Sequence, residues 1–284
     1  MTSSLYDQTA TAAAASVIRA YSTSFGLATR LLGPRVRGHV RSVYALVRVA
    51  DEIVDGAAAA AGLPLVAQRD TLDALERETL GAMASGFSAN LVVHAFAQVA
   101  RECGIHADLV EPFFASMRTD LETTEHDSAS HDVYVYGSAE VVGLMCLQVF
   151  VNAGRPDAPV QASPALVAGA RRLGAAFQDI NFLRDLADDS ERLGRDYLGA
   201  DRPSSRAAVL DRIDADLDAA ALTVADLPAD CRSAVTAAHD LFGELARRLR
   251  SSDGTGARVR VPDPVKAAIA ARAAAGARPR RRNA

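Results

Sequence analysis

The sequence has no tryptophan, a single lysine and few aromatic residues, which make up 5% of its 284 residues. Alanine, leucine, valine and arginine dominate, and all four are compatible with helices, so a strand-rich architecture is not expected. Cysteine is also scarce. Cys103, Cys146 and Cys231 are far apart in apolar helical segments, a pattern typical of buried free thiols in a reducing cytoplasm.

An excess of positive charge and a long hydrophobic run are both missing. The net charge is −4 and the pI is near 5.9, which argues against a nucleic-acid partner. No run of about 18 uncharged apolar residues occurs, and the N-terminus has no basic region followed by a signal-type apolar stretch. We therefore expect a cytoplasmic protein and leave a peripheral membrane contact open.

Helical periodicity covers most of the sequence, with glycine and proline at its interruptions. We expect about ten helices, the longest near 34–56, 133–153 and 164–193, and a break at 127–132. No alternating strand pattern or flexible linker occurs, so residues 1–276 are predicted to form one all-α domain. Residues 277–284 contain a basic run that we expect to be disordered.

Two acidic motifs stand out on this helical background. In the first, Tyr44, Arg48, Asp51 and Asp55 recur at helical spacing and are surrounded by apolar residues. In the second, the same spacing connects Gln178, Asn181, Asp185 and Asp189, with Arg184 beside them. A polar row on an otherwise apolar helix is costly to bury without partners, so we expect both rows to line a cavity.

Carboxylates four residues apart on a helix repel each other unless a cation lies between them. Mg²⁺ is the expected ion, with Mn²⁺ as the alternative, because it binds a few carboxylates and fills its remaining positions with water and phosphate oxygens. Arginine adds bidentate contacts to phosphate. The other interpretation is that both rows are ordinary solvated helix faces.

Two such helices facing each other would form a cavity with a metal-binding mouth and apolar walls, which suits a prenyl diphosphate. Metal ions and arginines would neutralise the departing diphosphate, and dry walls would protect the carbocation from water. Aromatic faces stabilise cations, and the candidates for this role are Phe25, Tyr44, Tyr134, Phe177 and Tyr197.

Over nearly its whole length the chain resembles the squalene/phytoene synthase family, and its bacterial phytoene synthases most of all. The resemblance rests on the S-x-S-F motif at 22–25, the acidic segment at 48–55, the segment at 142–145 and the block at 174–197. It implies an all-α isoprenoid synthase-type bundle around a central active-site cavity.

The resemblance also implies roles for individual residues. The catalytic set is Asp51, Asp55, Asp185, Asp189 and Tyr134, of which Tyr134 matches a family tyrosine near the reacting carbons. The magnesium ligands are Asp51, Asp55, Asn181, Asp185 and Asp189. The substrate is contacted by Ser22, Ser24, Phe25, Tyr44, Arg48, Gln178, Arg184, Arg195, Tyr197 and Arg258.

Four positions depart from the family pattern. Tyr21 stands where some relatives have histidine, His126 falls near a usual tyrosine, and Glu140 replaces a glycine. Phe242 stands where a phosphate-contacting tyrosine is common, and a phenyl ring cannot donate a hydrogen bond. Arg258 or Arg260 is the expected compensation.

The implied activity is magnesium-dependent, head-to-head condensation of two geranylgeranyl diphosphates through prephytoene diphosphate to 15-cis-phytoene. It needs no NADPH and begins carotenoid biosynthesis, so enzymes of that pathway are candidate partners. One alternative is squalene, dehydrosqualene or presqualene diphosphate synthesis from farnesyl diphosphate. The others are a chain-elongating or cyclising prenyl enzyme and a non-catalytic helical scaffold. The floor of the cavity would set the chain length, and the sequence does not locate it.

Overall fold

The structure, a computed structural model, describes residues 4–22, 24–122, 128–155, 158–192, 203–251 and 259–281. For residues 24, 128–129, 185–192 and 203–205 it describes the backbone alone. These described parts of the chain contain α-helices, one π-helix and one 3₁₀-helix, and no strand. The all-α prediction is confirmed.

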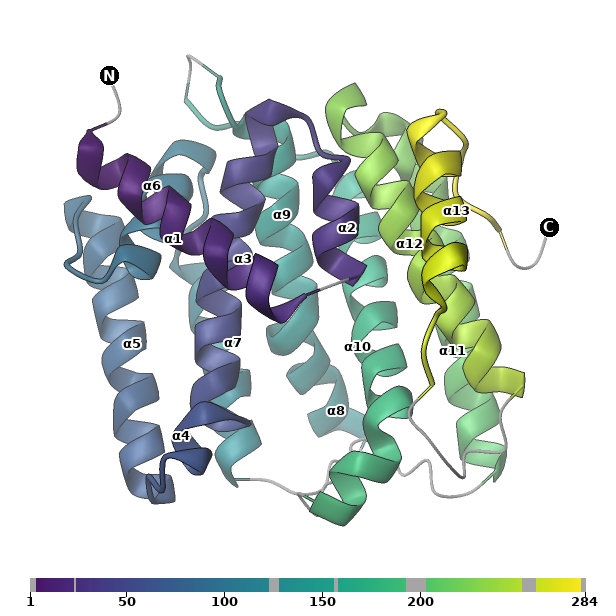
Figure 1. The fold of residues 1–284 in the computed structure, drawn as a ribbon, viewed down its shortest axis with the longest axis horizontal. Helices are drawn as coiled ribbons and strands as arrows, with labels where there is room; N and C mark the ends of the chain where they lie inside the picture. The colour runs from purple at the N-terminus through teal and green to yellow at the C-terminus, as the bar shows by residue number, and fades with distance from the viewer. Residues whose placement is uncertain are drawn as a thin grey trace.

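Short connections join most of the helices into a bundle (Figure 1). The π-helix, η1, continues without a break into α9, and the 3₁₀-helix, η2, follows α11. In chain order the helices are α1 (Leu5–Tyr21), α2 (Ser24–Arg30), α3 (Pro34–Val54), α4 (Ala57–Ala60), α5 (Leu65–Ser85), α6 (Leu91–Cys103), α7 (Ala107–Glu122), α8 (Ser128–Val135), η1 (Tyr136–Glu140), α9 (Val141–Asn152), α10 (Pro164–Arg192), α11 (Pro203–Thr223), η2 (Val224–Asp226), α12 (Ala229–Ser251) and α13 (Asp263–Ala274).

Local sequence signals set several helix ends. Ser4 and Asp7 form a capping box at the start of α1, and Asn90 accepts hydrogen bonds from the first backbone N–H groups of α6. Helices α5 and α6 end at Gly86 and Gly104, whose φ angles of 85° and 73° are readily adopted only by glycine.

The buried residues form two main clusters. The larger one is contributed chiefly by α3, α5, α6, α7 and α9, and the second by α10, α11, α12 and α13. Figure 1 shows α5 on one side of the bundle, α11 to α13 on the other, and α9 and α10 between them. The central cavity described below lies where the two clusters meet.

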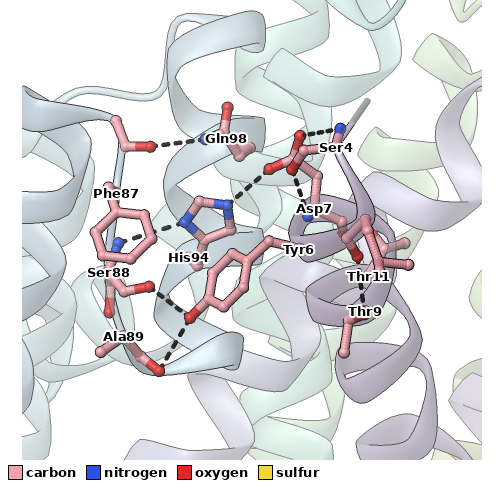
Figure 2. Close-up of polar contacts among 12 residues, drawn as sticks. Ser4, Tyr6, Asp7, Thr9, Thr11, Phe87, Ser88, Ala89, His94 and Gln98 are labelled. Atoms are coloured by element: carbon pink, nitrogen blue, oxygen red, sulfur yellow. Dashed lines mark hydrogen bonds and ion pairs between the residues drawn. The ribbon is translucent and has the colours of Figure 1, made fainter. Parts of the chain in front are cut away.

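Helix α1 crosses the bundle and is fixed near its N-terminus (Figure 2). Asp7 accepts a hydrogen bond from Nε2 of the buried His94 on α6, at 2.9 Å. Nδ1 of the same ring accepts the backbone N–H of Ser88, and the Tyr6 hydroxyl donates to the Ser88 carbonyl oxygen at 2.9 Å. Anchored in this way, α1 delivers Tyr21 and Ser22 to the side of α3.

Two of the long predicted helices are confirmed within two residues at each end, as α3 and α10. The helix expected at 133–153 corresponds to the continuous run of α8, η1 and α9, which begins five residues earlier and ends at Asn152. The break expected at 127–132 is wrong from Ser128 onward, because α8 begins there and continues through η1 into α9. The number of helices is larger than predicted, since short helices such as α2 and α4 are separate elements.

The chain beyond α13 is described as far as residue 281, and the disorder expected at 277–284 stays a prediction. The Arg280 backbone N–H donates to Asp240 on α12 at 3.0 Å, and the Arg278 carbonyl oxygen accepts from Arg272 at 2.9 Å. These hydrogen bonds tie the segment to the bundle. Residues 282–284 lie outside the described part.

One helical stretch, Ser130–Asn152, is long and apolar enough to cross a membrane by length and composition alone. Several of its residues pack in the larger core cluster and others line the central cavity. Core helices of soluble proteins pass the same test, so this stretch is weak support for a membrane span.

Candidate active site

The polar face of α3 begins with Tyr44, which is half-buried. Its ring stacks on Phe25 of α2 with centroids 5.7 Å apart, and its hydroxyl is hydrogen-bonded with Ser22. Burial raises the pKa of Tyr44, although Arg48 and Ser22 oppose the shift, so the hydroxyl stays protonated and able to donate. Three of the predicted substrate contacts therefore lie together.

Arg48 lies one turn further along α3. It forms an ion pair with Glu52, and its Nη1 is 3.9 Å from Oδ2 of Asp51. The guanidinium also lies over the Tyr21 ring, 4.5 Å from the ring centroid. Tyr21, noted above as a departure from the family pattern, thus covers one face of Arg48.

Asp51 and Asp55 lie at the C-terminal end of α3, where the helix dipole already disfavours negative charge. Burial raises the pKa of Asp51 to about 7, with Asp55 and Glu52 adding to the shift and Arg48 opposing it. The Asp51 side chain still keeps 35% of its surface exposed, so ions can reach it. A carboxylate such as Asp51, whose negative charge is disfavoured by its surroundings, fits a hard divalent cation such as Mg²⁺.

The second polar face lies on α10, an unbroken helix from Pro164 to Arg192. Gln178 and Asn181 are half-buried, and Asp185 and Asp189 follow on the same face by their spacing. Arg184, beside this face, is half-buried. The side chains of Asp185, Asp189 and Ser24 lie outside the described part, as do Arg195, Tyr197 and Arg258 altogether.

A cavity of about 260 Å³ lies between α2, α3, η1, α9, α10 and α12, and its walls are almost wholly apolar. Two of its lining residues lie near the acidic motifs. Val47 precedes Asp51 by about one helical turn on α3, and Gln178 precedes Asp185 by about two turns on α10. The cavity continues past α9 to Phe150 and Leu166. Helix α4 directly follows the acidic end of α3, and Figure 1 shows it at the same end of the bundle as the C-terminal end of α10. The lining of the apolar cavity thus reaches to within one or two helical turns of the acidic motifs.

Aromatic residues divide between the cavity and the core. Phe25 and Phe177 line the cavity. Phe242, which replaces a family tyrosine, stacks on Phe177 with centroids 3.8 Å apart and so supports the apolar wall. Tyr134 does not line the cavity: it is 5% exposed, and its hydroxyl donates to Asp120 at 2.8 Å. The catalytic role of Tyr134 that the resemblance implies stays a prediction.

The structure adds residues that the sequence analysis missed. Thr29, Ser138 and Cys146 line the cavity, and Glu52 contacts Arg48. Helical spacing from Phe25 to Thr29, and from Val142 to Cys146, is the signal that could have identified two of them.

Comparisons with known proteins agree with this geometry. The sequence model of the family described as squalene/phytoene synthase matches residues 18–207. The 15-cis-phytoene synthase of Paracoccus sp. is 29% identical over 263 residues, which cover 84% of this chain and 82% of that protein. The phytoene synthase of Rhodobacter capsulatus is 30% identical over 258 residues, covering 81% and 70%.

Solved structures share the fold. A dehydrosqualene synthase in complex with ligand superimposes with a TM-score of 0.77 at 22% identity, over 95% of this chain and 97% of that one. The squalene synthase HpnC from Alicyclobacillus acidocaldarius gives a TM-score of 0.70 at 17% identity, over 87% and 95%. With the family match spanning more than half of its residues, the chain belongs to the squalene/phytoene synthase family, a family of prenyltransferase-type enzymes.

Proposed function

We propose that this protein is a phytoene synthase. In this reaction two molecules of geranylgeranyl diphosphate join head to head, through prephytoene diphosphate, to give 15-cis-phytoene and two diphosphates. The observation that carries the proposal is the apolar cavity whose lining reaches to within about one helical turn of the acidic, arginine-bearing end of α3 and runs along α10. The phytoene synthases among its relatives support the choice of substrate.

In this proposal the polar end of the cavity binds the diphosphates. Asp51, Asp55, Asn181, Asp185 and Asp189 would hold Mg²⁺, which neutralises the charge of the leaving diphosphate. Arg48 donates hydrogen bonds to phosphate oxygens, and the Tyr44 hydroxyl adds a neutral donor. These contacts gain strength as negative charge builds up on the leaving group, so they favour cleavage of the allylic carbon–oxygen bond.

The apolar part of the cavity holds the hydrocarbon chains and excludes water. When the first carbon–oxygen bond breaks, the allylic cation is attacked by a double bond of the second molecule, and a proton is lost as a cyclopropane closes. Departure of the second diphosphate and loss of another proton give the hydrocarbon. Electrons balance without a reductant, so NADPH is not required. The rings of Phe25 and Phe177 face this space and can stabilise positive charge.

The test is to incubate the purified protein with Mg²⁺ and either geranylgeranyl or farnesyl diphosphate, without NADPH, and to identify the extracted hydrocarbons by mass spectrometry. Phytoene from the longer substrate is the expected product. Products from farnesyl diphosphate alone would keep the chemistry and overturn the substrate. Diphosphate release from neither substrate would favour a non-catalytic scaffold.

A further inference from the structure

Arg48 is held from several sides before any ligand arrives. The Tyr21 ring covers one face of its guanidinium, and Glu52 binds Nη2. Its Nε–H is buried and finds no hydrogen-bond partner among the described residues. A buried N–H donor without a partner costs free energy. The Arg48 Nε–H is therefore a donor that an oxygen of a bound ligand could satisfy.

Glu52 contacts two different elements at once. While one carboxylate oxygen binds Arg48, the other accepts the backbone N–H of Ala57, the first residue of α4, at 3.1 Å. Its side chain is only 20% exposed, against 33% for Arg48. A carboxylate fixed at both oxygens fixes its partner more firmly than a mobile surface ion pair does.

Gly56 makes room for this arrangement. A Cβ atom at position 56 would lie 2.5 Å from Oε2 of Glu52, closer than non-bonded atoms approach, so any larger residue would displace the carboxylate. The glycine, the carboxylate and the arginine therefore form a chain of contacts from α4 back to the polar face of α3.

We propose that Glu52 is a positioning residue that orients the Arg48 guanidinium for a diphosphate. The inference rests on the proposed function, because it is the diphosphate that Arg48 would meet. Arginine presents five N–H donors in a rigid fork, and Glu52 engages Nη2. The pairing keeps the fork in one orientation, so less rotamer entropy is lost when phosphate oxygens bind the remaining donors.

The test measures binding of magnesium pyrophosphate by calorimetry, together with KM and kcat for the accepted prenyl diphosphate. Glu52→Gln keeps an oxygen for the Ala57 N–H but loses the charged partner of Arg48. We expect it to weaken pyrophosphate binding and raise KM about tenfold, with a smaller change in kcat, because the lost orientation affects ground state and transition state alike. Gly56→Ala, which moves Glu52 without removing its charge, should act in the same direction.

Two further variants separate positioning from a merely structural role. In an Arg48→Lys background, Glu52→Gln should have almost no added effect, because the group through which Glu52 acts is gone. Glu244→Gln is the matched control: Glu244 on α12 pairs with Arg247 and Arg248 at the same helical spacings, far along the chain from the cavity mouth. It should bind pyrophosphate as the wild type does.

Unchanged pyrophosphate binding by Glu52→Gln would overturn the proposal. Tighter binding would also overturn it, because Glu52 would then compete with the ligand for Arg48. Additive losses in the double variant would overturn it as well. A wild-type protein that neither binds magnesium pyrophosphate nor releases diphosphate from a prenyl substrate would overturn the proposed function together with the role of Glu52.

Discussion

At the scale of single residues, Asp51 combines its proposed role in metal binding with a cost to stability. Its carboxyl group has a pKa of about 7 in the folded protein against 3.8 as its ordinary value. Between about pH 4 and 7, the folded state therefore keeps a proton on Asp51 that the unfolded state has released. The contribution of Asp51 to stability falls as the pH rises through that interval.

Asp51→Asn should accordingly stabilise the protein in the absence of divalent ions. At pH 8 we expect a gain of about 1 kcal/mol, reduced from the full effect of the pKa shift because the side chain is partly exposed. The gain should shrink as the pH is lowered towards 4. Urea unfolding at several pH values measures it. A variant less stable than the wild type at pH 8 would show that Asp51 is well compensated without a metal ion.

Tyr134 is a residue for which sequence and structure suggest different roles. Because its hydroxyl donates to the buried Asp120, Tyr134→Phe should lower the free energy of unfolding by about 1.5–3 kcal/mol. The rate of turnover per folded molecule should change little. If the variant is as stable as the wild type and inactive, the catalytic role implied by the family resemblance is correct.

The placement of Arg48, Asp51 and Asp55 on one face of a helix was predictable, because helical spacing alone gives it. The role of Glu52 was not predictable in the same way. It depends on where the chain turns after α3, so that the Ala57 N–H meets the carboxylate. A spacing pattern does not contain that turn.

At the scale of elements, close helix contacts shape the cavity. A Cβ atom on Gly143 of α9 would lie 2.7 Å from the Ala170 carbonyl oxygen of α10, so the two backbones nearly touch. Both residues line the cavity. The contact therefore sets how far apart these two walls stand.

Gly143→Ala should push α9 away from α10 and destabilise the protein by about 1–3 kcal/mol, since a rigid backbone atom must move. Gly81→Ala in α5 is the matched control, because nothing lies within 4 Å of its Cβ position. It should stabilise by about 0.4–1 kcal/mol, as alanine restricts the unfolded chain. Thermal unfolding of both variants is the measurement, and equal effects would contradict the close contact.

The π-helix η1 was not predictable from the sequence. Apolar periodicity predicted a helix through this region, but a π-turn depends on packing against neighbours. A Cβ atom on Gly137 would lie 2.1 Å from the Ser116 hydroxyl oxygen and 2.3 Å from the Pro112 carbonyl oxygen of α7. Contacts of this kind join residues far apart in the chain, and no local pattern records them.

At the scale of the whole molecule, Asp240 joins the C-terminal segment to the bundle. Its buried carboxylate accepts hydrogen bonds from His239, Arg272 and the Arg280 backbone. Burial alone would raise its pKa, but these donors lower it below 3.8. The stabilisation is thus present above about pH 4 and lost as the pH falls below that value. A basic run does not reveal an acidic partner elsewhere in the chain, so composition alone did not predict these contacts.

Asp240→Ala should destabilise the protein by about 3–5 kcal/mol, because Arg272 and His239 lose a buried charged partner. Asp263→Ala offers a control, since Asp263 pairs with Lys266 at the surface and is 94% exposed. It should change stability by less than about 0.5 kcal/mol. Similar losses in both variants, measured by urea unfolding, would mean that the C-terminal segment is not held through Asp240.

The central claim is that the acidic ends of α3 and α10 bind the diphosphate whose departure starts the reaction. Release of pyrophosphate from geranylgeranyl diphosphate tests it most directly, measured for the wild type, Asp51→Asn and Asp185→Asn with circular dichroism as the check on folding. The account predicts Mg²⁺-dependent release by the wild type and a loss of at least about a hundredfold in each folded variant. Release at the wild-type rate by both variants would contradict it.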